Sequence, residues 1–259
     1  MKKLLLLAAV AMGCIGMNAQ EKLTLSTYKG TDLAKYANKT LTVTVSRYLF
    51  NGWNTISLPF AMSQEQVNET FGNDCRLERL AGIENDGTDI KLNFQNCKSE
   101  GIKANVPYIL YYTGLTGTKN FTTENATVSN TPAARTFTAE GTGETVTMAA
   151  AKQQKDAAGL YGILAKDNAE AAFVNVDNVS NGFYATRCYI QLSNGNSTLL
   201  TTNHIVEEAS SISAVVKAGE QVDVYNISGR RVASGINAAE LSRLQKGIYV
   251  VKGKKVLVK

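Results

Sequence analysis

The sequence predicts an all-β protein, with a sandwich or barrel-like main domain that contains one short helix and a small β-sandwich at the C-terminus. Two observations predict this class. Several short segments alternate apolar with polar residues, which places the two kinds on opposite faces of a strand. Turn dipeptides separate these segments, among them Asn51-Gly52 and Asn181-Gly182.

Strand signals dominate the main part of the chain. Residues 40–45 alternate threonine with leucine and valine, which is typical of a half-buried strand. The next segment is apolar at positions on both faces, so Trp53 and Phe60 are expected in the core. Residues 149–158 carry a weak helical pattern. The expected strands are residues 40–45, 53–60, 90–94, 106–112, 160–164, 171–176 and 188–192.

One helix is signalled at both ends. Ser63 and Gln66 form a capping box, in which the serine oxygen accepts from the Gln66 amide while the Gln66 side chain reaches back. Val67 and Phe71 are four residues apart and therefore share one face. Gly72 is a typical residue just beyond a helix end. A two-turn amphipathic helix is expected here.

The N-terminus predicts export. In residues 1–19, two lysines precede an apolar stretch that is too short to span a bilayer, as in a secretory signal peptide. Cleavage is expected between Ala19 and Gln20. In the alternative, Cys14 becomes a lipidated N-terminus. No later segment is long and apolar enough for a transmembrane helix.

Charge divides the chain into two parts. The formal net charge is +5, but residues 20–210 carry −3 and residues 211–259 carry +6. The predicted organisation is a signal peptide, a β-domain at 20–206, a linker at 207–213 and a tail domain at 214–259. A basic cluster can mark nucleic-acid binding. The family resemblance of the tail accounts for the basic cluster better, so no nucleic-acid partner is expected.

The tail combines strand and turn signals in a fixed order. Val222 and Val224, and later Ile248 and Val250, alternate like strands with one buried face. This pattern resembles the type A C-terminal sorting domain of the type IX secretion system of Gram-negative bacteria, over residues 211–259. The resemblance implies that the outer-membrane secretion machinery is the partner and that the protein is secreted or displayed on the cell surface. The expected sorting signal comprises Val224, Tyr225, Asn226, Gly229, Lys246, Gly247, Ile248, Tyr249, Gly253, Lys254, Lys255 and Val256.

The main domain carries a second set of sequence motifs. Together these motifs resemble a recurrent adhesin-like β-domain of bacterial surface proteins, over most of residues 40–192. The resemblance implies an adhesion, interaction or structural module, and it assigns no functional residue. Members of that family often have Cys where Ser57 stands and Ala where Cys188 stands. The motifs that carry this resemblance are residues 52–60, 70–72, 102–109, 160–163 and 187–192.

Catalytic and metal chemistry find little support. His204 is the only histidine, and its position beside the linker predicts a solvated or hydrogen-bonded residue at a loop edge rather than a catalytic base. Cys75 and Cys97 can pair as a disulfide after export, whereas Cys188 lies in an apolar pattern and is expected to be a small buried residue. No catalytic residue, metal or cofactor is assigned.

Aromatic residues leave one alternative open. Tyr108, Tyr111, Tyr112 and Trp53 can line a platform for a surface glycan, although aromatic residues in strands mostly fill cores. Tyr108 and Tyr112 share one strand face and Tyr111 lies on the other. Core positions are expected.

The carboxylate residues leave a second functional alternative open. Glu84, Asp86 and Asp89 cluster in a turn whose spacing matches no complete calcium loop, so a solvated turn is expected. Glycoside hydrolases need only two carboxylates across a cleft, and sequence cannot pair them. The expected function is a non-enzymatic surface module with a glycan or protein ligand. A glycan-binding module or a carboxylate-dependent glycoside hydrolase is the alternative.

Overall fold

The computed structural model describes residues 21–26, 30–85, 89–131, 133–139, 143–151, 159–163, 171–176, 183, 186–193, 199–205, 215–217 and 219–258. The all-β class is confirmed, with a large curled sheet as its main feature. The expected signal peptide and linker lie outside these ranges.

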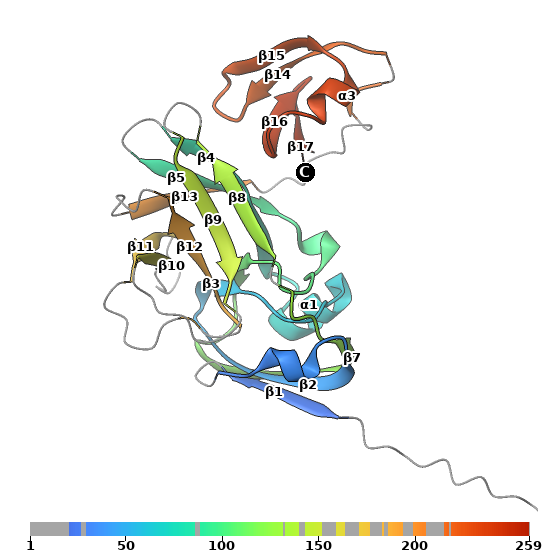
Figure 1. Cartoon of the computed structure of the whole chain (residues 1–259), viewed down its shortest axis with the longest axis vertical. Helices are drawn as coiled ribbons and strands as arrows, with labels where there is room; N and C mark the ends of the chain where they lie inside the picture. Colours follow the sequence, from blue (N-terminus) through green and yellow to red (C-terminus); the bar gives the residue numbers. More distant parts are fainter. Residues whose placement is uncertain are drawn as a thin grey trace, which may run out of the picture.

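Strands in the described ranges form three sheets (Figure 1). The first sheet has the order β1-β2-β7, the second β3-β6-β4-β5-β13-β11-β10-β12-β9-β8 and the third β15-β14-β16-β17. The bounds are β1 Lys22–Ser26, β2 Thr40–Leu49, β3 Gly52–Ile56, β4 Arg76–Asn85, β5 Ile90–Asn96, β6 Tyr108–Tyr112, β7 Gly117–Thr127, β8 Ala134–Thr138, β9 Thr145–Ala150, β10 Leu160–Ile163, β11 Phe173–Asn175, β12 Cys188–Leu192, β13 Leu199–Ile205, β14 Val222–Asn226, β15 Arg231–Ile236, β16 Gly247–Val251 and β17 Lys254–Val258. The helical segments are η1 Leu33–Tyr36, α1 Gln64–Phe71, η2 Lys98–Glu100 and α3 Ala238–Leu241.

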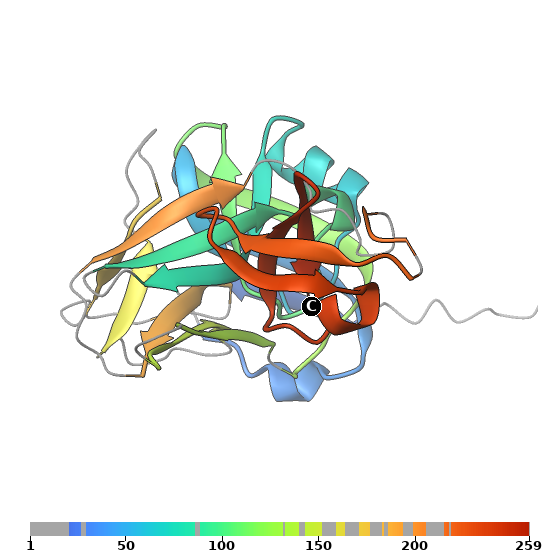
Figure 2. The same ribbon diagram turned by 90° about the horizontal axis from the view of Figure 1, so that it is seen from above.

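The ten-stranded sheet curls so that a strand from its far edge returns to its middle. Arg135 on β8 donates from Nε to the Leu80 carbonyl oxygen on β4 at 2.6 Å. Figure 2 shows the two ends of this sheet wrapping around a common interior. The sheet is antiparallel except where β13 runs parallel to β5. The main domain is therefore barrel-like, and the three-stranded sheet lies at the end opposite the tail (Figure 1).

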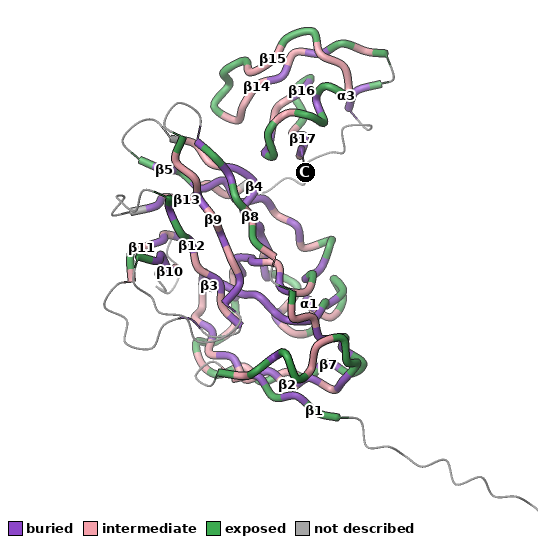
Figure 3. Tube along the Cα trace, viewed as in Figure 1, coloured by how far each residue is buried: buried purple, intermediate pink, exposed green. Residues whose placement is uncertain are grey.

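Two apolar cores fill the main domain, as the buried tube segments in Figure 3 indicate. One core lies between the three-stranded sheet, α1 and one face of the curled sheet, and contains Phe60 and Phe71. The other lies inside the curl, where Trp53 packs near the stacked rings of Phe94 and Phe173. Trp53 is 4% exposed and Phe60 is fully buried, which confirms the expectation for both.

The expected helix is confirmed in detail. The Ser63 oxygen accepts from the Gln66 amide, and the Gln66 side chain accepts from the Ser63 amide. Val67 and Phe71 are buried on its inner face. The weak helix expected at 149–158 is wrong in its described part, because β9 ends at Ala150 and pairs with β12. Ala149 lies opposite Tyr189 in this strand pairing. The tertiary contacts of the strand outweigh the helix propensity of the segment.

The tail is a small domain with its own core. Its central valines pack with Leu241 of α3 and with Val215 and Val216, which precede the first tail strand. The four strands belong to one sheet, so the expected sandwich of two sheets is not what the described tail residues form. The reason is that α3 and residues 215–216, rather than a second sheet, cover the inner face.

Candidate functional site

The tail sheet uses both of its faces. Tyr249 and Val251 on β16 contribute to the tail core. Ile248 lies on the other face and packs against Ala81 of β4, with Ile227 and Leu257 beside it. The expectation of a single buried face on β16 was therefore incomplete, because the main domain buries Ile248 from the second side.

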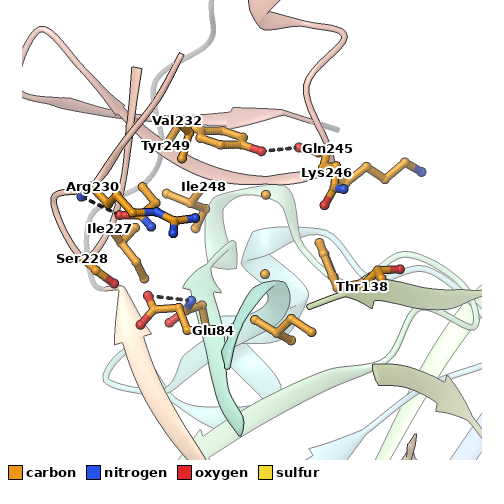
Figure 4. Close-up of a pocket in the computed structure, with 16 residues that line it drawn as sticks. Glu84, Thr138, Ile227, Ser228, Arg230, Val232, Gln245, Lys246, Ile248 and Tyr249 are labelled. Atoms are coloured by element: carbon orange, nitrogen blue, oxygen red, sulfur yellow. Dashed lines mark hydrogen bonds between the residues drawn. The ribbon is translucent and has the colours of Figure 1, made fainter. Parts of the chain in front are cut away.

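A groove of about 630 Å³ runs between the main domain and the tail (Figure 4). Main-domain side chains such as Glu84 and Thr138 line one wall, and tail side chains such as Arg230 and Tyr249 line the other. The Tyr249 hydroxyl donates to the Gln245 carbonyl oxygen at 2.9 Å, which fixes its ring along the tail wall. Backbones of the two domains also approach closely, since a Cβ on Gly82 would lie 3.8 Å from the Gly247 Cα.

The expected sorting residues fall into three environments. Asn226, Lys246, Gly247, Ile248 and Tyr249 line the groove. Val224 and Val256 are buried in the tail core, and Tyr225 is half-buried. Gly229, Gly253 and Lys254 are exposed at hairpin turns, with Lys255 half-buried beside them. The expected sorting residues thus lie together in the small tail domain, and the exposed ones are mainly at its turns.

The hairpin turn between β16 and β17 illustrates how local sequence shapes the tail. Val251 pairs with Lys254, so the turn contains only Lys252 and Gly253. Both have positive φ, at 52° and 74°. Two-residue hairpins favour this left-handed geometry because its twist matches that of the strands, and glycine adopts it without steric cost. The turn also exposes a lysine on each side of the glycine.

The expected loop-edge position of His204 is wrong, whereas the hydrogen bonding that the sequence left open for it is confirmed. The residue lies within β13, its side chain is 18% exposed, and its Nδ1 lies 2.6 Å from Oε2 of the fully buried Glu78. The ring stacks on Trp53 with centroids 4.3 Å apart. Arg76 donates to the other Glu78 oxygen and lies over the Trp53 ring. Pairing of β13 with β5 carries the histidine into the curled sheet, which proximity to a linker does not reveal.

This cluster has two parts of a catalytic triad but not its chemistry. The Thr202 hydroxyl oxygen lies 3.3 Å from His204 Nε2, where a nucleophile would stand. That hydroxyl donates its proton to the Ala171 carbonyl oxygen, so the imidazole faces a lone pair rather than a proton it could remove. The two ring nitrogens lie within hydrogen-bond distance of Glu78 and of Thr202. The arrangement fixes buried polar groups inside the curl.

The sequence held one signal for this cluster. Arg76 and Glu78 are two apart, and this spacing puts both side chains on the same face of a strand. Residues 76–85 were not expected to be a strand, so the pair was missed. The third residue of the cluster, His204, is 126 residues away from Glu78 in the sequence. Only tertiary strand pairing brings it next to Glu78.

The disulfide that the sequence left possible between Cys75 and Cys97 is not formed in the structure. Cys75, Cys97 and Cys188 are all free, buried thiols. Burial raises the pKa of Cys97 and of Cys188 to about 12, so neither is a ready nucleophile. Cys97 Sγ donates to the Leu77 carbonyl oxygen and Cys188 Sγ to that of Tyr108. The thiols act as small core residues, as expected for Cys188.

Aromatic residues occupy core positions, as expected. Tyr108 and Tyr112 are buried in the core beside α1, and Tyr111 packs edge-on against Trp53 on the other face of β6. An exposed glycan platform made from these rings is therefore excluded. Glu84 accepts from Asn93 at 3.3 Å. Asp86 lies outside the described residues, and within the described part no three His, Cys, Asp or Glu side chains are grouped as metal ligands.

A second ion-pair cluster lies on the opposite face of β4. Arg79 is 7% exposed and donates from both terminal nitrogens to Glu100, at 2.6 and 2.7 Å. Lys103 donates to the same carboxylate at 2.9 Å. Burial raises the pKa of Glu100, but hydrogen bonds from Arg79 and Lys103 and their positive charges outweigh it and lower the pKa to about 2.

Replacing Glu100 by Gln is expected to destabilise the protein at neutral pH and less so in acid. The folded pKa of about 2 lies below the ordinary 4.5, so the ionised carboxylate stabilises the fold fully above pH 4.5. That contribution is lost as the pH falls toward 2. Urea unfolding of wild type and Glu100→Gln between pH 2 and pH 7 measures the effect. Glu124→Gln, on an exposed position of β7, is the matched control. A gap between wild type and Glu100→Gln that does not change with pH would contradict the expectation.

Comparison with protein-family models, with curated proteins and with solved structures finds no match to this chain. Within the described ranges, no helix is long and apolar enough to cross a membrane. Functional inference therefore rests on the residues and their geometry.

Proposed function

We propose that the protein is an exported, non-enzymatic module of the bacterial surface, and that its tail sheet is the sorting signal read by the type IX outer-membrane machinery. The observation that carries this proposal is the separate apolar core of the tail. A domain that folds around its own core can be recognised as a unit, whatever main domain precedes it.

The exposed elements of the tail indicate where recognition occurs. Among the described strands, β17 pairs only with β16, so its other edge can offer backbone groups to a partner. Lysines at 252 and 254 lie at the beginning of that edge and are exposed. Gly247 and Ile248 face the main domain instead. A receptor can therefore reach the β16–β17 turn and the β17 edge without separating the two domains.

The main domain supports a binding or structural role over catalysis. Apolar side chains fill both cores, and the single histidine is held by Glu78, Thr202 and Trp53. Its ligand class is a surface glycan or protein. A barrel-like scaffold with filled cores suits the presentation of loops and edges rather than the enclosure of a substrate.

Charge reversal at the β17 edge tests the sorting role. The double variant Lys254→Glu, Lys255→Glu is expected to lose most of its surface and medium signal in the native host and to accumulate in the periplasm. The matched control reverses two lysines at the far end of the molecule, Lys22→Glu and Lys35→Glu. Fractionation followed by immunoblotting measures the distribution.

A stability measurement makes this test specific. Lys254 is exposed and Lys255 is half-buried, so the double variant should unfold close to wild type. Normal export of the folded double variant would refute the assignment of recognition to this edge. Normal export after deletion of residues 246–259, which removes β16 and β17 altogether, would refute the sorting role itself.

A further inference from the structure

A small basic cavity of about 260 Å³ lies between β4, β8 and the tail. Four cationic side chains line it: Arg79, Lys103, Arg135 and Lys246. They come from four separate segments of the sequence, and Lys246 belongs to the tail. Tyr108 and Phe137 contribute aromatic surface to the same cavity.

The charges around this cavity are not balanced. Glu100 is the carboxylate that faces these cations, and it is shared by Arg79 and Lys103. Neither Arg135 nor Lys246 has a carboxylate partner within the described part of the chain. Burial, followed by the positive charge of Arg79, lowers the pKa of Arg135, so the charged guanidinium is less favourable here than in water. A bound anion would reverse that effect.

Two side chains at the cavity carry hydrogen-bond donors that no described residue uses. Arg79 contributes only charge, because its terminal nitrogens bind Glu100 and its Nε has almost no accessible surface. The Tyr108 hydroxyl accepts from the Lys103 amide at 3.1 Å, which leaves its own proton to donate. Arg135 uses Nε for the Leu80 carbonyl oxygen, and its two terminal nitrogens remain. Buried donors without acceptors are costly, so an acceptor in this cavity would stabilise the structure.

We propose that this cavity binds an oxyanion group, a sulfate, phosphate or carboxylate, carried by a small ligand. The guanidinium of Arg135 suits bidentate contact with two oxygens of such a group. The volume lies below that of typical cavities for drug-sized ligands, so it accommodates the anionic group with few attached atoms. The apolar face of Phe137 can pack against those atoms.

The tail takes part in this site through Lys246. A ligand held there contacts the main domain and the tail together and strengthens their association. The inference is independent of the proposed export role, because it depends on the cavity and not on recognition of β17.

Calorimetric titration of the purified protein with sodium sulfate, sodium phosphate and sodium glucuronate tests the site, with sodium chloride holding ionic strength constant. At least one of the three is expected to bind saturably, and the tightest identifies the oxyanion class. Arg135→Gln is expected to weaken that binding by about tenfold to a hundredfold, as for loss of a charged hydrogen-bond donor. Lys22→Gln, the same kind of change at the opposite end of the molecule, should leave the affinity unchanged.

A second variant guards against an effect on folding. Lys246 is exposed, so Lys246→Gln should leave the melting temperature of the unliganded protein unchanged while it weakens binding about twofold to fivefold, as for loss of an exposed charge contact. Equal affinities for Arg135→Gln, Lys246→Gln and Lys22→Gln would overturn the proposal. Absence of saturable binding for all three anions would overturn it as well.

Discussion

Replacing Trp53 by Ala is expected to lower the free energy of unfolding by about 3–5 kcal/mol, as for other buried aromatic residues. The side chain is 4% exposed and lies in the core of the curled sheet. It packs edge-on against Tyr111 and face-on against His204. Truncation therefore removes apolar burial and also leaves a cavity beside a buried ion pair, which adds to the cost.

Chemical denaturation at neutral pH measures this effect. Leu115→Ala is a suitable control, because Leu115 is a large apolar side chain that is 91% exposed, and its truncation should change stability by less than about 0.5 kcal/mol. Trp53→Phe should lie between wild type and Trp53→Ala, since it retains most of the apolar volume. An unchanged midpoint for Trp53→Ala would place the ring on the surface and restore the glycan-platform hypothesis.

Replacing His204 by Leu is expected to cost about 1.5–3 kcal/mol, the range for a hydrogen bond to a charged group. Glu78 is fully buried and loses its donor at 2.6 Å in this variant. Arg76 still donates to the other carboxylate oxygen, so the loss falls short of full isolation of the charge. Urea unfolding of the single variant gives the value.

A double-mutant cycle separates the interaction from simple repacking. Glu78→Leu combined with His204→Leu should be less destabilised than the two single effects predict, because no buried carboxylate is then left without its donor. Additive effects would show that the contact between Glu78 and His204 contributes nothing. A hydrolytic activity that is present in wild type and vanishes with His204→Leu would contradict the non-enzymatic proposal.

Local sequence determined several features of this protein by itself. The capping box at Ser63 and the glycine at 72 define α1, and the Lys252-Gly253 dipeptide defines the last hairpin. Alternation at residues 40–45 predicts the buried and solvent-facing positions of β2. Each of these signals acts within a few residues, through a hydrogen bond, a positive φ or the two-residue period of a strand. No distant partner is needed to read them.

Tertiary structure alone decided the strand order and the polar clusters. The segment that contains His204 was not among the expected strands, yet it forms β13 because it pairs with β5 and with β11. Ala149 becomes part of β9 for the same kind of reason. Arg79, Arg135 and Lys246 meet at one cavity only because the sheet curls and the tail docks on β4. Such pairings depend on burial summed over the whole chain. A short segment of sequence does not indicate which distant strand will pair with it.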